Sequence, residues 1–129
     1  FVIMPNVYTN HKAKLANTSL TTIYTVPTAK TAIIKSIRVA NEDTSNDCNI
    51  TVTLVDSGSN IFMLEKDRTI QAKRSQELLA TGNMAQDSAD SSVAGPTPLI
   101  AKESEIIKAQ AENANDLSII ISVLEISDV

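Results

Sequence analysis

Hydrophobic and polar residues alternate along residues 20–56, and this alternation predicts three consecutive β-strands at residues 20–26, 32–41 and 49–56. Their side chains are dominated by Ile, Val and Thr, whose branched Cβ suits a pleated, half-buried surface. In the third strand, apolar side chains share one face and threonines the other. That pattern is typical of a strand with one face in the core.

The alternation in residues 32–41 is interrupted at Lys35. Ile33 and Ile37 fall on one side of the expected strand, and Ile34 falls on the other. Two interpretations stay open: a β-bulge shifts the register near Lys35, or both faces of this strand are partly covered.

Turn-forming residues divide the rest of the chain into further short segments. A hairpin turn at residues 56–60 leads into a mixed apolar stretch, and residues 67–68 are expected to break it. Residues 117–126 are apolar on both faces, which predicts a central strand covered on both sides. The other expected strands are 13–17, 69–72, 75–80, 99–102 and 105–112. A helical turn at 75–80 and a helix at 105–112 remain alternatives.

About nine or ten short strands with turn signals between them are typical of an all-β antiparallel sandwich, and we expect a jelly-roll-like one. Residues 1–12 begin apolar, contain Pro5 and show no sustained period. We therefore predict an N-terminal arm at 1–12 before a single sandwich domain at 13–129. The alternative, that this segment covers an edge of its own sheet, stays open.

Residues 81–98 form the longest stretch without predicted structure, and long loops in compact domains tend to be functional. Plain insertion and contact surface both remain open for this loop. If contact with other molecules belongs to the arm and the loop, the candidate contact residues are Phe1, Val2, Ile3, Met4, Tyr8, Met84, Asp87, Asp90 and Val93.

Charge and composition narrow the classes of function. The net charge of −4 and the dispersed Lys and Arg residues argue against nucleic-acid binding. No run approaches the roughly 18 apolar residues of a membrane span, and no signal peptide is recognised, so we expect no membrane partner. The densest basic group is interpreted as a solvated strand edge; it consists of Lys66, Arg68, Lys73 and Arg74.

Candidate chemistry is sparse. One cysteine, Cys48, excludes an intrachain disulfide, and we expect it to be a small, semi-buried side chain. His11 is the only histidine and is expected at the surface. The sequence contains no Gly-rich phosphate loop and no HExxH motif, and it has no Trp to form a sugar-binding platform. The acidic loop at 41–47 offers the oxygen ligands of a calcium site, but it lacks the Gly and the bidentate Glu of such loops. We therefore expect no enzyme, cofactor or metal.

The sequence contains a TIYTVP strand, an IIKSIRVAN strand, a TVTLVD strand, and an AENANDL turn before a strand that ends in Glu-Ile. In these features the chain resembles small virion structural proteins of tailed bacteriophages, especially those of marine and cyanobacterial phages. The shared features cover most of residues 20–126. They describe strand chemistry, so no functional residue is carried over from the family.

This resemblance implies a β-sandwich on the particle, and we expect a capsid decoration (cement) protein that binds and stabilises the assembled shell. Its partners would be the major capsid protein or other virion proteins, and its location the capsid surface. A tail, neck or fibre-associated subunit is the alternative, and a carbohydrate-binding module for host attachment is the second alternative. Decoration subunits often occupy threefold positions, so a homo-oligomer, preferably a trimer, is expected.

Overall fold

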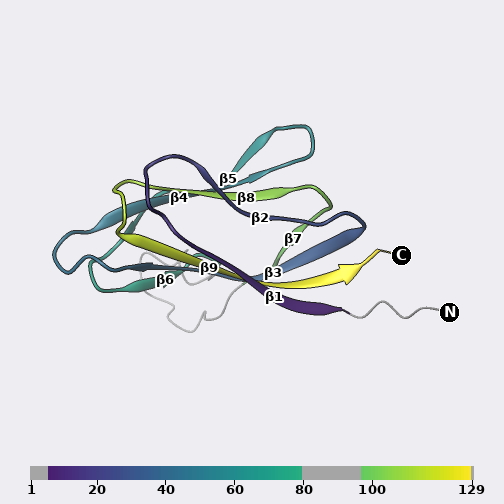
Figure 1. Cartoon of the computed structure of the whole chain (residues 1–129), viewed down its shortest axis with the longest axis horizontal. Coiled ribbons are helices and arrows are strands. Elements are labelled where there is room, and N and C mark those ends of the chain that lie inside the picture. Colours follow the sequence, from purple (N-terminus) through teal and green to yellow (C-terminus); the bar gives the residue numbers. More distant parts are fainter. Residues whose placement is uncertain (1–5, 80–96, 129) are drawn as a thin grey trace, which may run out of the picture.

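The computed structural model describes residues 6–79 and 97–128. Within these residues every regular element is a β-strand. They form two antiparallel sheets that pack face to face (Figure 1). The all-β sandwich predicted from the sequence is confirmed. The strands are β1 (Val7–Lys14), β2 (Thr21–Thr25), β3 (Lys30–Asn41), β4 (Cys48–Val55), β5 (Ile61–Ile70), β6 (Ser75–Glu77), β7 (Leu99–Ala101), β8 (Ile106–Ala111) and β9 (Leu117–Ser127).

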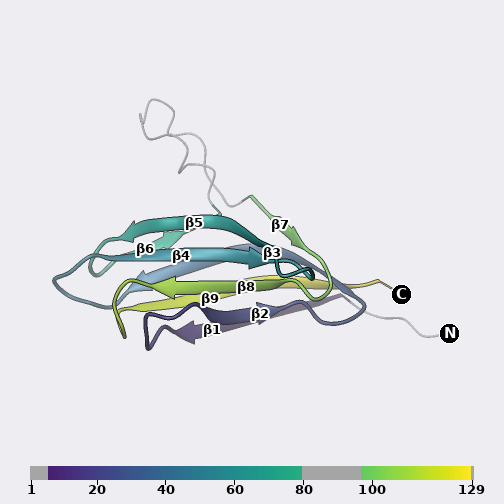
Figure 2. The same cartoon turned by 90° about the horizontal axis from the view of Figure 1, so that it is seen from above.

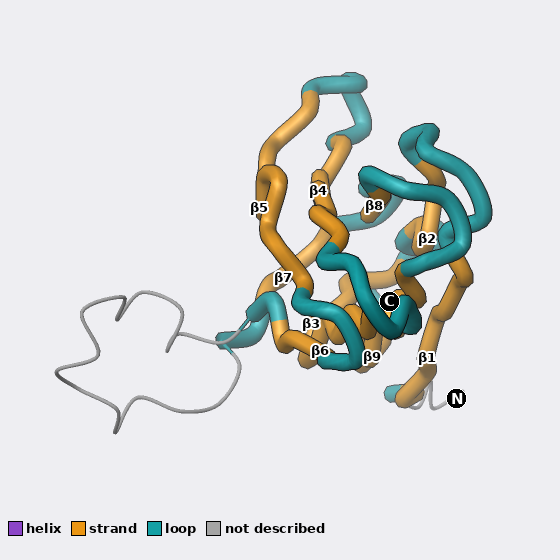
Figure 3. Tube along the Cα trace, turned by 90° about the vertical axis from the view of Figure 1, so that its left-hand side faces the viewer, coloured by secondary structure: helices purple, strands orange, loops and turns teal. Residues whose placement is uncertain are grey.

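The strand order is that of a jelly roll. Sheet A has the order β1-β9-β3-β6, with β7 also paired to β3, and sheet B has the order β2-β8-β4-β5. The two last strands return between earlier ones, because β8 pairs with β2 and β4 while β9 pairs with β1 and β3. This interleaving of early and late strands in two sheets defines the jelly roll. Figure 3 shows the two layers nearly end-on.

The core between the sheets is aliphatic, as the shortage of aromatic residues requires. On β9 every second side chain from Leu117 to Val123 is buried, and on β4 the same holds from Cys48 to Val52. Cys48 is fully buried. Burial raises the pKa of its thiol, which disfavours the nucleophilic thiolate and fits a packing role.

A β-bulge in β3 confirms one of the two interpretations of Lys35. The register of β3 against β9 shifts between Ile34 and Ser36. The carboxylate of Glu77 on β6 accepts a hydrogen bond from the Ile37 N–H at 2.8 Å and another from the Ser36 hydroxyl. Glu77 thus satisfies polar groups next to the point where the ladder is disrupted.

The N-terminal segment differs from the predicted arm over much of its length. Residues 7–12 belong to β1, which pairs with β9 at the edge of sheet A, as the alternative interpretation had it. Residues 1–5 lie outside the described part of the chain. His11 is half-buried, and its ring centroid lies 4.2 Å from that of Tyr24. The surface position expected for His11 is therefore wrong, because every second residue of β1 faces the core.

One expected break also differs in the structure. Residues 61–70 form one strand, β5, where we expected a break at residues 67–68 and a separate strand after it. Register shifts between β4 and β5 absorb the irregularity, and Asp67 takes a left-handed φ of 49° there. At 75–80 and 105–112, where a helical turn and a helix were the alternatives, the predicted strands are confirmed as β6 and β8.

A buried hydrogen bond joins the two sheets near one end. The Tyr24 hydroxyl, on β2 of sheet B, donates to Glu125 Oε2, on β9 of sheet A, at 2.7 Å. Both side chains are buried. Burial, and then the neighbouring Glu125, raise the pKa of Tyr24 well above its usual value, so the hydroxyl keeps its proton and remains the donor.

Replacing Tyr24 with Phe should therefore destabilise the fold. The change leaves the buried Glu125 without this donor, and loss of a hydrogen bond to a charged group costs about 2 kcal/mol. Thermal or urea unfolding of Y24F should show a lower free energy of unfolding. Tyr8→Phe is the matched control, since Tyr8 is 74% exposed and should change stability little. Equal stability of the two variants would contradict a role for this bond.

Candidate interaction surfaces

A row of apolar side chains crosses the outer face of sheet A. Tyr8 of β1 lies opposite Leu124 of β9, and Leu124 lies opposite Ile33 of β3. Ile33 in turn lies opposite Ile100 of β7. Directly opposite residues point to the same side of a sheet, so these four side chains line up across four strands; we call them the apolar row. Tyr8 is 74% exposed and Ile100 is 60% exposed.

The outer face of β9 corrects a prediction from the sequence. We expected layers on both sides of this strand, yet only its inner face packs against another sheet of the described chain (Figure 3). Ile120 on the outer face is 43% exposed, and Leu124 is half-buried. The sequence shows that both faces are apolar but not what covers each. Exposed apolar side chains that gather on one face are typical of a contact surface.

Of the candidate contact residues, Tyr8 lies in the described part of the chain, and it belongs to the apolar row. Sequence reasoning missed Leu124, Ile33 and Ile100, because they come from distant segments that only the strand register brings together. The remaining candidates lie outside the described residues: Phe1, Val2, Ile3, Met4, Met84, Asp87, Asp90 and Val93.

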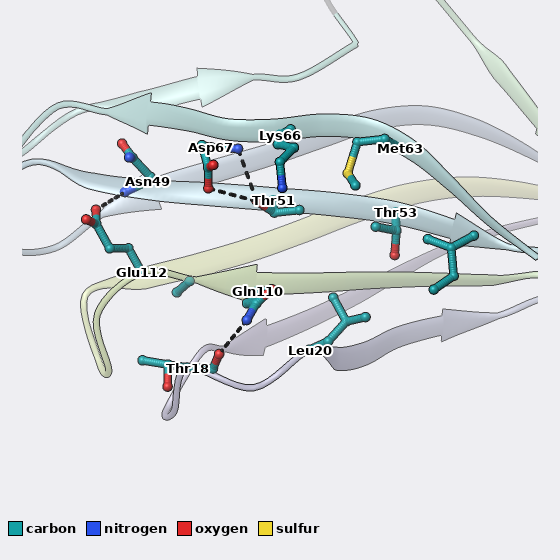
Figure 4. Close-up of a pocket in the computed structure, with 12 residues that line it drawn as sticks. Thr18, Leu20, Asn49, Thr51, Thr53, Met63, Lys66, Asp67, Gln110 and Glu112 are labelled. Carbon is teal, nitrogen blue, oxygen red and sulfur yellow. Dashed lines mark hydrogen bonds between the residues drawn. The ribbon is translucent and has the colours of Figure 1, made fainter.

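A groove of about 600 Å³ lies on the outer face of sheet B (Figure 4). The groove is lined by Thr51 and Thr53 of β4 and by Gln110 of β8. Its two sides are formed by Met63 of β5 and by Leu20, which directly precedes β2. The groove therefore combines hydroxyl and amide groups from the middle strands with apolar side chains from its two sides. Its volume falls in the range typical of ligand sites.

The polar groups in the groove differ in how they are satisfied. The Thr51 hydroxyl accepts a hydrogen bond from the Asp67 N–H at 3.1 Å and donates to its carboxylate at 3.3 Å. Gln110 donates to the Thr18 carbonyl at 2.9 Å. The Thr53 hydroxyl is buried and has no hydrogen-bond partner within the described chain, although its residue is only 2% exposed. Buried polar groups are nearly always paired, so this hydroxyl marks a position that a bound molecule can satisfy.

The basic group predicted as a solvated strand edge lies at and just beyond β5. Lys66 lines the groove, and Arg68 forms an ion pair with Glu65 at 3.7 Å. Lys73 and Arg74 lie in the turn between β5 and β6. Arg68 and Arg74 together line a second, smaller pocket of about 340 Å³.

The acidic loop after β3 uses its side chains to hold its own backbone and that of the turn after β5. The Asp43 carboxylate accepts hydrogen bonds from the N–H groups of Ser45 and Asn46 at 2.7 and 3.0 Å, and these bonds lower the pKa of Asp43. The Asp47 carboxylate accepts from the Ala72 N–H. Residues 6–79 and 97–128 contain no group of three or more His, Cys, Asp or Glu placed to hold a metal ion. The same residues include no helix able to cross a membrane.

The fold and its surfaces define a jelly-roll sandwich with apolar side chains on both outer faces. No protein-family model matches the sequence, and no curated protein matches it. A chain of the acidic stable capsid structure of Helicobacter pylori bacteriophage KHP30 is similar, with a TM-score of 0.48 and 16% identity over 99% of this chain and 92% of that one. A chain of infectious bursal disease virus Gt strain gives 0.40 and 5% over 96% and 31%.

Thr53→Val should stabilise the isolated chain. The substitution keeps the branched shape and removes a buried hydroxyl that has no partner, so the free energy of unfolding should rise by about 1 kcal/mol. Thr51→Val is the matched control: its hydroxyl is paired with Asp67, and its loss should destabilise the chain by a similar amount. Urea unfolding measures both. A destabilised T53V variant would show that the hydroxyl has a partner in the free chain.

Proposed function

We propose that the chain is a non-enzymatic structural subunit of a tailed-phage virion, a decoration (cement) protein that binds the assembled capsid shell and stabilises it. The observation that carries this proposal is the apolar row on the outer face of sheet A, together with the exposed Ile120 beside it. A sheet face of this kind needs a partner, and the described residues supply none. The resemblance of residues 20–126 to small virion proteins favours a virion protein as that partner.

The energetics suit a decoration role. Fully burying one large apolar side chain contributes about 1.5 to 3 kcal/mol, so a docked apolar row supports a firm contact even after the cost of association. A protein that binds only the assembled shell raises the stability of that shell by mass action. Many copies on one particle multiply the effect. The rigid sandwich supplies the surface, and no reaction is required.

The location on the particle is tested by counting copies. We expect purified heads to carry the chain in numbers comparable to those of the major capsid protein, and empty shells to bind it. Quantitative gels or mass spectrometry of separated heads and tails measure this. Recovery of the chain with tails alone would contradict the proposal and favour a tail or neck subunit.

The contact surface is tested by a double substitution, Tyr8→Lys with Ile100→Lys. Both side chains are largely exposed, so the fold should persist, while two desolvated ammonium groups should weaken binding to shells by about tenfold or more. Co-sedimentation with shells that lack the protein measures the affinity. Thr25→Lys is the control, since Thr25 is exposed on the outer face of sheet B. Equal binding by the unsubstituted chain, the double variant and T25K would rule out sheet A as the contact face.

A further inference from the structure

The groove on sheet B is separate from the apolar row and lies on the opposite outer face of the sandwich. Its apolar sides are Leu20, Ile61 and Met63, which are 38%, 60% and 49% exposed. Between them lies the buried Thr53 hydroxyl without a partner. An occupant must therefore offer apolar side chains together with a polar group that can bond to this hydroxyl.

An extended polypeptide segment meets both requirements. Its side chains can contact the apolar sides, while its unpaired backbone N–H and C=O groups can reach the hydroxyl, which both donates and accepts. A sugar fits less well, because none of the residues that line the groove is aromatic. The groove thus favours a peptide that is apolar and extended.

The chain itself contains such a segment. Residues 1–5 read FVIMP, four consecutive large apolar residues followed by a proline. Proline restricts the residue before it to extended conformations, so Met4 is biased toward the backbone shape that the groove requires. We infer that the groove receives residues 1–5 of a neighbouring copy of this chain.

The reach of the segment favours a neighbour over the same chain. Residues 1–5 join β1, which lies at the edge of sheet A beneath β2, since His11 of β1 packs on Tyr24 of β2. Ile61 and Met63 belong to β5, the opposite edge of sheet B (Figures 2 and 3). Three strand spacings of about 4.8 Å and a sheet separation of about 10 Å lie between these edges. Five residues span at most about 18 Å, and the straight path crosses the core.

Cysteine cross-linking between two variants tests this inference. One chain carries Ile3→Cys and the other Met63→Cys, both with Cys48→Ala, so that a disulfide can form only between chains. We expect the mixed disulfide dimer to be the main product under mild oxidation. The control pairs Ile3→Cys with Arg38→Cys, because Arg38 is exposed on the outer face of sheet A. Equal yields from the two mixtures, or no cross-link in either, would overturn the inference.

Thr53→Val gives a second readout that cross-linking cannot supply. T53V should weaken self-association about fivefold in sedimentation experiments, and deletion of residues 1–5 should do the same. Thr22→Val is the control, because Thr22 is exposed and lies outside the lining of the groove, and it should leave self-association unchanged. Unchanged association of T53V would overturn the inference. Saturable binding of a millimolar monosaccharide that needs Thr53 but not residues 1–5 would also overturn it, in favour of a sugar site. These experiments use only the purified chain, so their failure and failure of shell binding are distinguishable.

Discussion

The pairing of β9 with β3 is the constraint on which the rest of the sandwich depends. The last strand runs antiparallel to β3 along the whole length of β3 and also carries β1 on its other edge. The inner face of β9 supplies the isoleucines at the centre of the core. Glu77 holds the bulge in β3 that adjusts the register of this pair. Sheet A is therefore complete only when β1 and β9, which are far apart in the sequence, have paired.

The same strand explains why the outer face of sheet A carries exposed apolar side chains. Its apolar residues occur on both faces, but a two-layer sandwich covers only one of them. The other face, continued by Tyr8, Ile33 and Ile100, remains open in the described chain and forms the apolar row. Sheet B has an open outer face too, with a groove that holds an unpaired hydroxyl. Both features fit a protein that acts through contacts. Residues 6–79 and 97–128 contain no group of three or more His, Cys, Asp or Glu placed to hold a metal ion.

Much of the fold was predictable because alternation of apolar residues reports directly on strands with one buried face. The strands β2, β3, β4, β8 and β9 followed from this pattern, and the hairpin turn after β4 followed from its turn-forming residues. The bulge near Lys35 was one of two interpretations that the pattern left open. β1 did not, because its inward residues include Thr9, His11 and Ala13, which lie at an edge and are only half-buried. The break expected in β5 was wrong, because a bulge at Asp67 absorbs the polar residues without ending the strand.

The candidate surfaces were less predictable, for a physical reason. A contact surface on a sheet consists of residues that lie opposite one another on different strands, and single-strand patterns carry no register between distant segments. Tyr8 was predicted because the segment around it is apolar, whereas Ile100 became visible only through its place opposite Ile33. The unpaired hydroxyl of Thr53 could not be distinguished from the other outward threonines of β4, since pairing depends on neighbours from β5 and β8.

A cryo-electron microscopy reconstruction, at side-chain resolution, of the phage head proposed to carry the chain would show directly which face of the sandwich makes the contact. We predict that the chain lies on the shell with the outer face of sheet A turned toward it, and with Tyr8, Ile33 and Ile100 within about 4 Å of major capsid protein atoms. A reconstruction in which the chain lies on the head with this face exposed to solvent would contradict it.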